Sequence, residues 1–181
     1  MTTPLLTIGH STRTLDEFLT LLGAHAIAHV VDVRRVPRSR RMPHFSGPAL
    51  ARSLAEAGIA YTHLPDLGGM RPPSTEPQHA GLPETFRGYA AHMETARFLA
   101  ALEELQRLGG DSRVAFLCAE ADPTQCHRSL IADALLARGV EVVHIVDAGP
   151  PRPHRLTASA VRHDGRVSYP GKQAQLPLGD R

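Results

Sequence analysis

Short apolar runs alternate with amphipathic segments along most of the chain. The apolar runs predict five strands, at residues 5–8, 28–33, 60–64, 114–118 and 141–146. Segments with apolar residues three or four apart predict helices between them, at residues 15–22, 46–58, 83–108 and 126–138, the third with a break near Glu94. A capping box at residues 14–17 marks the start of the first helix.

The predicted strands are apolar along their whole length, and such strands are usually buried on both faces of a sheet. We therefore expect an α/β fold, a three-layer Rossmann-like domain over residues 1–148 with a mainly parallel sheet of about five strands. Beyond Asp147 the composition shifts to Pro, His, Arg and Gly. Residues 149–169 predict an extension that packs on this domain, with a short hairpin around Asp164 and Gly165, and residues 170–181 predict a flexible tail.

Composition adds limits to this picture. The chain has 181 residues, of which 42% are hydrophobic and 21% charged, as in an ordinary globular domain. Two cysteines are too few for a disulfide scaffold, and no apolar stretch approaches the roughly 20 residues of a membrane span. We expect a cytoplasmic protein without a membrane partner. A net charge of +2 does not by itself indicate nucleic-acid binding.

Polar residues follow the predicted strands at the point where each one ends. In an open parallel sheet the ligand site lies outside the carboxyl ends of the strands, so these residues are expected to meet at one edge. They are His10 and Ser11, Asp32 and Arg34, His63 and Asp66, Cys118 and Glu120, and Asp147. We therefore predict a functional pocket at this edge.

Residues 32–41 carry five arginines and no acidic residue after Asp32. The guanidinium fork binds phosphate or carboxylate in a bidentate manner, so an anionic small molecule or a nucleic-acid backbone is the expected partner. Arg34 and Arg38 are the candidate anion-binding residues of this loop. The alternative is a solvated basic loop in which Asp32 pairs with Arg34.

The segment from Cys118 to Arg128 holds the strongest group of reactive residues. Cys126, His127 and Arg128 fall at the first turn of a predicted helix, where free backbone amides and the positive dipole end favour an anion and a thiolate. Cys126 is therefore the better candidate nucleophile and Cys118 the alternative. Both cysteines could instead be structural, since buried cysteines often act as small hydrophobic residues.

Proton transfer and anion binding need further groups at the same edge. We assign His10 or His127, with Asp32 or Glu120, to proton transfer, and Ser11 and Arg128 to anion binding beside the loop arginines. The spacing of Cys118 and Cys126 is not a standard zinc spacing, and neighbouring Cys126 and His127 side chains diverge by about 100° if both are helical. We expect no metal and no other cofactor; His10 or His63 would complete a metal site in the alternative case. A transient redox pair of the two cysteines is a further alternative.

Four sequence blocks resemble the domain of unknown function 488 family over residues 5–145. They are residues 7–11 (TIGHS), 31–39 (VDVRRVPRS), 64–69 (LPDLGG) and 117–132 (LCAE…CHRSLIA). The resemblance implies a Rossmann-type α/β fold and a shared polar site, but no established reaction. Carried to this chain, that site consists of His10, Ser11, Asp32, Arg34, Arg38, Cys118, Glu120, Cys126, His127 and Arg128.

The tail contains Gln175, Leu176 and Leu178, which resemble the short peptide that binds the bacterial DNA polymerase sliding clamp. The aromatic anchor of that peptide is missing here, because Gly179 and Asp180 follow. The clamp is therefore a weakly supported partner.

Three classes of function remain open. We expect an enzyme, a hydrolase or transferase, that acts on an anionic, phosphate-bearing substrate such as a nucleotide or nucleic acid. The alternatives are a nucleic-acid-binding or DNA-maintenance module without catalysis, and a metal-binding or redox-sensing cysteine protein.

Overall fold

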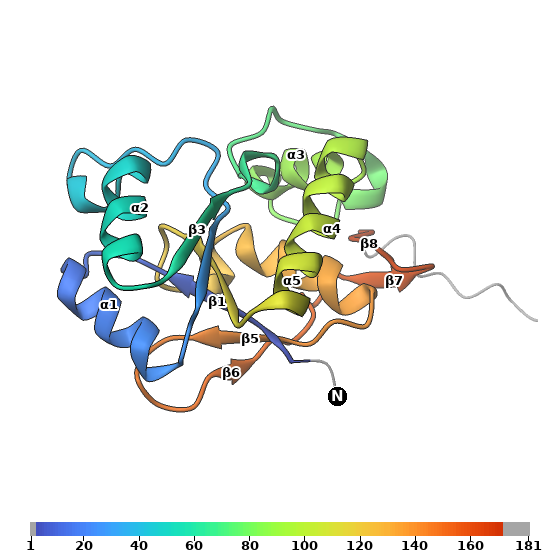
Figure 1. Cartoon of the computed structure of the whole chain (residues 1–181). Helices are drawn as coiled ribbons and strands as arrows, with labels where there is room; N and C mark the ends of the chain where they lie inside the picture. Colours follow the sequence, from blue (N-terminus) through green and yellow to red (C-terminus); the bar gives the residue numbers. More distant parts are fainter. Residues whose placement is uncertain (1–2, 172–181) are drawn as a thin grey trace, which may run out of the picture.

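A computed structural model describes residues 3–171 and shows a six-stranded, mostly parallel sheet (Figure 1). The strands are β1 (Leu5–Gly9), β2 (His29–Asp32), β3 (Ala60–His63), β4 (Val114–Cys118), β5 (Val142–Ile145) and β6 (Arg152–Pro153). Their order in the sheet is β3-β2-β4-β1-β5-β6, and only β6 runs antiparallel to its neighbour. The predicted α/β class and the five parallel strands are confirmed. The sixth strand was not predicted, because two residues that include a proline give no strand pattern.

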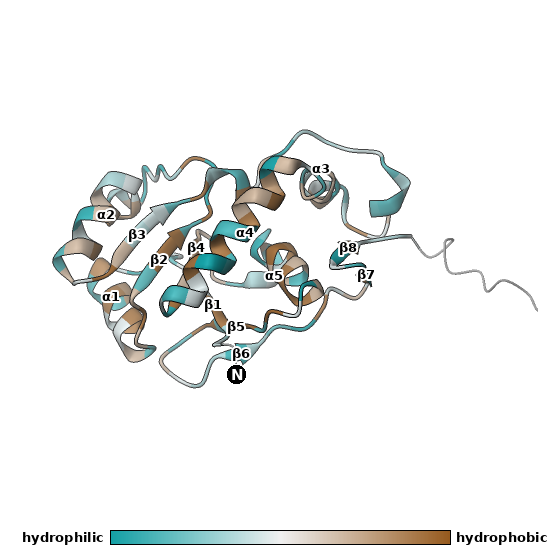
Figure 2. Cartoon of the chain, turned by 45° about the vertical axis from the view of Figure 1, so that its right-hand side comes forward, coloured by the Kyte–Doolittle hydropathy of each residue, from teal (hydrophilic) through white to brown (hydrophobic). Residues whose placement is uncertain are grey.

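Five helices cover the two faces of the sheet. They are α1 (Leu15–Ala24), α2 (Gly47–Glu56), α3 (Glu84–His92), α4 (Ala96–Asp111) and α5 (Arg128–Ala137). In Figure 1, α1 and α2 lie on one side of the sheet and α4 and α5 on the other. The hydropathy colouring in Figure 2 shows part of β2 as hydrophobic, and α4 with both hydrophobic and hydrophilic positions. Strands enclosed in this way explain the unbroken apolar runs in the sequence.

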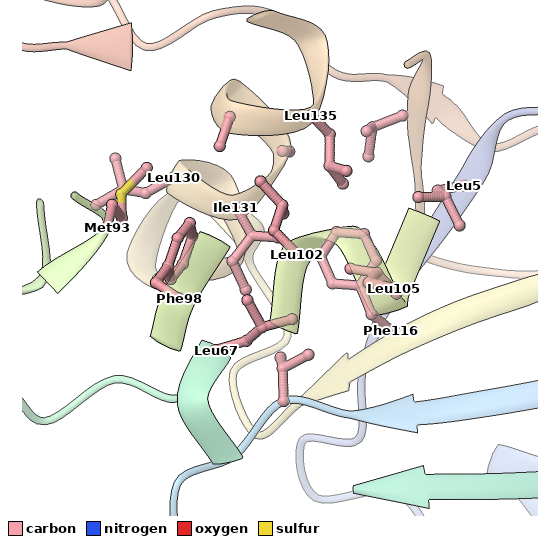
Figure 3. Packing of buried hydrophobic residues seen from close by; sticks show 14 of the residues in the cluster. Leu5, Leu67, Met93, Phe98, Leu102, Leu105, Phe116, Leu130, Ile131 and Leu135 are labelled. Carbon is pink, nitrogen blue, oxygen red and sulfur yellow. The ribbon is translucent and has the colours of Figure 1, made fainter. Parts of the chain in front are cut away.

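Each face of the sheet has its own buried core. Figure 3 shows Phe98 and Leu102 of α4 packed close to Ile131 and Leu135 of α5. The other face packs α1 and α2 against the opposite side of the strands, with Phe18 of α1 fully buried. Together these layers fix where the strands end and therefore where the site residues lie.

Local signals set most helix boundaries. The capping box is present, since the Glu17 amide donates to Thr14 Oγ1 over 3.1 Å and the Thr14 amide donates to Glu17 Oε2 over 2.7 Å. The predicted helix at 83–108 is two helices, α3 and α4, with Thr95 as the N-cap of α4. The break near Glu94 is thus confirmed.

The predicted start of the last helix was wrong. Residues Pro123–Gln125 form a 3₁₀ turn, and Cys126 follows in an extended conformation with φ −136° and ψ 147°. His127 is the N-cap of α5, which begins only at Arg128. Asp122 accounts for this difference, because its carboxylate accepts from the Thr124 amide and holds the 3₁₀ turn apart from the helix.

The predicted C-terminal hairpin is present as β7 (Val161–His163) and β8 (Arg166–Ser168). Asp164 and Gly165 form its turn with φ values of 49° and 72°, a conformation that Asp and Gly tolerate. The predicted clamp-binding residues Gln175, Leu176 and Leu178 lie outside the described residues. Within residues 3–171, no helix has the length and apolar character to cross a membrane.

A buried chain of hydrogen bonds joins the C-terminal extension to α5 and the sheet. Its centre is Asp133, a fully buried carboxylate on α5. Asp133 accepts from the Tyr169 hydroxyl over 3.0 Å, from His154 Nε2 over 2.8 Å and from the Thr157 amide over 3.0 Å. One carboxylate therefore holds three positions of the chain after β5, at residues 154, 157 and 169, against α5.

The chain of hydrogen bonds continues through His154 and His144. His154 Nε2 donates to Asp133, and a hydrogen bond of 2.9 Å joins His154 Nδ1 to His144 Nε2. A further hydrogen bond of 2.7 Å joins His144 Nδ1 to the Thr7 hydroxyl on β1. Burial lowers the pKa of His144 to about 4, with the neighbouring His154 as a smaller cause, so the ring stays neutral at pH 7.

Substitution of Asp133 tests this chain. We expect Asp133→Asn to lower the free energy of unfolding by about 2–4 kcal/mol, because it removes a buried charge and places an amide donor against donors. Urea unfolding followed by circular dichroism measures the change. The matched control is Asp164→Asn, an exposed turn residue, for which we expect a change within about 0.5 kcal/mol. Equal effects of the two variants would contradict a central role for Asp133.

Candidate active site

A cavity of about 350 Å³ opens at the carboxyl ends of β1, β2 and β4. We call it the thiol cavity, because both cysteines of the chain line it. The other lining side chains with ionisable or polar groups are His10, Arg34, Arg35, Arg38, Ser39, Thr85, Tyr89, Glu120, Gln125 and His127. Seven of the ten predicted site residues thus line one cavity, and Ser11, Asp32 and Arg128 do not.

Two thiols and an imidazole meet in the wall of the thiol cavity. His127 Nδ1 lies 3.6 Å from Cys126 Sγ and 3.8 Å from Cys118 Sγ. Cys118 is the last residue of β4, whereas Cys126 and His127 come from the turn before α5. The extended backbone at Cys126 turns its side chain back toward the strand end. The divergence expected if both Cys126 and His127 were helical does not apply, because neither residue lies within the helix.

The start of α5 stabilises negative charge on Cys126. The Arg128 amide donates to Cys126 Sγ over 3.5 Å, and the Ser129 amide donates to the Cys126 carbonyl over 3.1 Å. These are amides of the first helical turn, whose positive dipole end favours an anion. The free amides that we predicted for a substrate anion are thus occupied by Cys126 itself.

The two thiols differ in acidity. The neighbouring Cys118 thiol lowers the pKa of Cys126, and His127 and Arg128 lower it further. The neighbouring Cys126 sulfur, together with burial, raises the pKa of Cys118. These opposite shifts favour Cys126 as the thiolate and Cys118 as the thiol of the pair.

Backbone groups fix the orientation of the His127 ring. Its Nε2 donates to the Val33 carbonyl over 3.4 Å, which directs Nδ1 at the two sulfur atoms. The ring packs against Tyr89 with a centroid distance of 5.1 Å. A Cβ at Gly69 would lie 2.9 Å from His127 Nδ1, so only glycine leaves room for the ring at this place.

Arg128 lies behind the thiol cavity and is 1% exposed. Its Nη2 donates to the carbonyls of Glu120 over 2.6 Å and Ala121 over 3.3 Å, and its Nη1 donates to Thr7 Oγ1 over 3.4 Å. A substrate in the cavity does not reach these groups. Arg128 instead holds the loop after β4 in place.

The same loop passes very close to β1. A Cβ at Gly9 would lie 1.8 Å from the Glu120 carbonyl oxygen, which no packing adjustment of a side chain relieves. Glycine at this position lets the loop approach β1 and brings the carbonyls of residues 120 and 121 within reach of Arg128.

Asp32 and Arg34 form a buried ion pair. Asp32 accepts from Arg34 Nε over 2.9 Å and from Nη2 over 2.6 Å, and it also accepts from the Tyr61 hydroxyl over 2.8 Å. Asp32 is fully buried and Arg34 is 7% exposed. Most of the Arg34 fork is thus engaged within the protein, which leaves it little capacity for an external anion.

Arg34 also contacts His10. Since His10 Nδ1 donates to the Ser11 carbonyl over 2.8 Å, His10 Nε2 accepts from Arg34 Nη1 over 3.3 Å. Burial, with a smaller contribution from the Arg34 charge, lowers the pKa of His10 to about 4, although the hydrogen bond to the Ser11 carbonyl acts in the opposite direction. The ring stacks on Phe45 at 4.3 Å and is neutral at pH 7. Ser11 contributes only its backbone here and does not line the cavity.

The charges that remain accessible lie at the rim. Arg35, Arg38 and Glu120 are exposed and line the thiol cavity. Arg35 uses only Nη1 internally, as a donor to the Met70 carbonyl over 2.7 Å. Within residues 3–171, Arg38 has no ion-pair partner.

Sequence reasoning did not select Arg35, Gly69 or Tyr89 as site residues. Arg35 belongs to the arginine-rich loop, but its sequence position alone does not show that it faces the cavity. Gly69 lies within the third residue block that we compared, and Tyr89 shows only the apolar spacing of a helix. His63 and Asp147 also follow strands, yet neither lines the thiol cavity.

The fold and the cavity define a Rossmann-like α/β protein with a thiol pair and an imidazole at the carboxyl edge of its sheet. Among known families, the model of the Domain of unknown function DUF488 matches residues 14–135, and the chain belongs to this family. The resemblance predicted from four sequence blocks is thus confirmed. Neither the curated proteins nor the solved structures with which the chain was compared contain a match.

Alkylation tests the difference in acidity between the two thiols. We expect iodoacetamide to modify Cys126 in the native protein at least ~10-fold faster than Cys118, because the thiolate is the reactive form. Peptide mass spectrometry after timed quenching measures both rates. In denaturant the two rates should become similar. A faster reaction of Cys118 in the native protein would contradict the assignment.

Proposed function

We propose that this protein is an enzyme, a hydrolase or transferase, that acts on a phosphate-bearing substrate, either a nucleotide or a nucleic acid, in the thiol cavity. The observation that carries this proposal is the position of Cys126, which lies beside a second thiol and an imidazole in a cavity with exposed arginines at its rim. A purely structural cysteine pair has no need of these surroundings. A free thiol pair also stays reduced in the cytoplasm, which is the compartment we propose.

Size and charge support an anionic substrate. A volume of about 350 Å³ is within the range of small-molecule sites. Arg35 and Arg38 supply positive charge at the rim, whereas the charge of Arg34 is balanced by Asp32. An arginine fork binds the oxygens of a phosphate in a bidentate manner. We therefore assign substrate binding to Arg35 and Arg38.

The chemistry we propose is phosphoryl transfer through the thiolate. Cys126 Sγ attacks phosphorus, so that a sulfur–phosphorus bond forms while the bond to the leaving oxygen breaks. That oxygen departs with its electron pair and takes the proton from the Cys118 thiol. Water, or a hydroxyl acceptor in a transferase, then attacks phosphorus and gives its proton to Cys118. Cys126 leaves as the thiolate, and the site is restored.

Histidine has a positioning role in this scheme. His127 Nδ1 faces both sulfur atoms and holds the two cysteines beside one another. His10 is neutral and its Nε2 is engaged by Arg34, so its part is to orient Arg34 rather than to transfer protons. Glu120 at the rim is exposed and has the role of orienting the attacking water, whose proton goes to Cys118.

A phosphate-ester assay tests this proposal. With p-nitrophenyl phosphate and a panel of nucleotides, in a phosphine reductant and a chelator, we expect Cys126→Ser to lower kcat by ~10²-fold or more. Arg38→Ala should raise KM with a smaller effect on kcat, since it removes a binding charge. The matched control is Arg52→Ala, an exposed arginine outside the cavity lining. Unchanged turnover in Cys126→Ser, or no turnover of any ester, would contradict the proposal.

A second candidate function rests on the exposed basic loop. Arg35, Arg38, Arg40 and Arg41 are all exposed, and they lie within seven residues of one another. Such a row of charges can contact several phosphates of a nucleic-acid backbone. The protein would then be a nucleic-acid-binding module for DNA maintenance, with or without catalysis in the cavity.

Salt dependence distinguishes this second candidate. We expect a labelled oligonucleotide to bind less tightly as salt rises, and the Arg38→Ala/Arg40→Ala variant to reduce the slope of log K against log salt by ~1–2. Fluorescence anisotropy at two salt concentrations measures both. Arg52→Ala/Arg162→Ala removes the same charge elsewhere on the surface and serves as the control. Absence of binding at low salt, or equal losses in both variants, would exclude this loop as a nucleic-acid contact.

A further inference from the structure

We propose that Cys118, Cys126 and His127 form a binding site for one Zn²⁺ ion, with an open coordination position that faces the thiol cavity. This inference does not rest on the proposed reaction, since metal binding is measurable without a substrate. It assigns to the three side chains a ligand that neither the sequence spacing nor the family indicates.

The distances between the three ligand atoms agree with a tetrahedral zinc centre. Zinc binds thiolate sulfur at about 2.3 Å and imidazole nitrogen at about 2.0–2.1 Å, so tetrahedral angles place sulfur and nitrogen about 3.6 Å apart. The structure has His127 Nδ1 at 3.6 Å from Cys126 Sγ and at 3.8 Å from Cys118 Sγ. All three ligand atoms, the two sulfurs included, lie within 4.8 Å of one another. Little movement is needed to close the site on an ion.

The protein prepares the imidazole as a ligand. A zinc-binding histidine usually donates its other ring N–H to a carboxylate or a backbone carbonyl, which fixes the tautomer and the orientation of the ring. Here His127 Nε2 donates to the Val33 carbonyl, and Gly69 leaves space beside Nδ1. The free electron pair of Nδ1 is therefore directed at the point where the ion would lie.

The sulfur ligands are also suited to a dication. Cys126 receives the Arg128 amide on the side of α5, which supports the thiolate. Entry of Zn²⁺ releases the remaining proton of the pair, so that two thiolates balance the two positive charges of the ion. The site then carries no net charge, which suits the buried position of both cysteines.

Three protein ligands leave one position of the tetrahedron open. Within residues 3–171, no fourth His, Cys, Asp or Glu ligand atom joins this group. The three ligands line the thiol cavity, so a water molecule or an anionic oxygen from the cavity can take the fourth position. Zinc sites with three protein ligands and an open position are typical of catalytic rather than structural centres.

Zinc and the thiolate reaction exclude one another. Once both sulfur atoms are bound to the ion, Cys126 is a ligand and cannot attack an electrophile. Zinc-loaded protein should therefore resist alkylation at Cys126 and should lack the thiol-dependent activity. Removal of the ion with a chelator should restore both the alkylation of Cys126 and the activity.

Metal titration tests the site directly. The full chain, reduced with a phosphine and freed of metal, is titrated with Zn²⁺ in competition with a chromophoric chelator, and with Co²⁺ for spectroscopy. We expect one ion per chain, the visible bands of tetrahedral Co²⁺, and a thiolate-to-cobalt charge-transfer band. Cys118→Ser, Cys126→Ser and His127→Gln should each weaken zinc affinity by more than the ~10–100-fold that loss of a supporting contact causes. His163→Gln, an exposed histidine, is the matched control.

A measurement on the unaltered chain guards against misfolded variants. One equivalent of Zn²⁺ should suppress alkylation of Cys126 by iodoacetamide, and excess chelator should restore it. Alkylation unaffected by zinc, an octahedral cobalt spectrum, or equal affinity in all four variants would overturn the proposal. The two proposals fail separately: Cys126-dependent turnover without zinc binding removes only the metal site, and tight zinc binding without any turnover removes only the enzyme.

Discussion

The geometry of the site depends on one buried cation, the guanidinium of Arg128. A buried charge needs partners for its hydrogen bonds, and here the carbonyls of residues 120 and 121 and the Thr7 hydroxyl accept from the two Nη atoms, while Nε is buried without a partner. Because Arg128 is also the first residue of α5, its amide contacts Cys126 while its side chain holds the loop after β4. The two cysteines are thus brought together by the same residue that links α5 to β1.

Through Thr7 this cation is connected to the C-terminal part of the chain. Thr7 is hydrogen-bonded to His144, and the chain of hydrogen bonds continues through His154 to Asp133 and Tyr169. The chain of hydrogen bonds thus joins a positive charge at one end to a negative charge at the other. Changes at Tyr169 can therefore reach the loop beside the thiol cavity, although Tyr169 does not line it.

The sequence predicted the fold class and most of the cavity lining because both follow from local patterns. Buried parallel strands give continuous apolar runs, and their carboxyl ends place Cys118 and Arg34 at one edge. The direction of the Arg128 side chain could not be predicted, since a charge at a helix start can face either a ligand or the protein. The extended backbone at Cys126 could not be predicted either. It depends on where the 3₁₀ turn that Asp122 and Pro123 start comes to an end, only a few residues before α5. The pairing of Asp133 with His154 and Tyr169 joins segments that are distant in the sequence, so no local sequence pattern predicts it.

The contact between Gly9 and the Glu120 carbonyl allows relatives to be sorted by sequence alone. Any side chain at position 9 displaces the loop after β4, and with it the carbonyls that receive Arg128. A family member with another residue at this position must have a different loop and a differently placed arginine. Glycine here, together with the Cys-His-Arg sequence at 126–128, thus separates members that share this site from members that share only the fold.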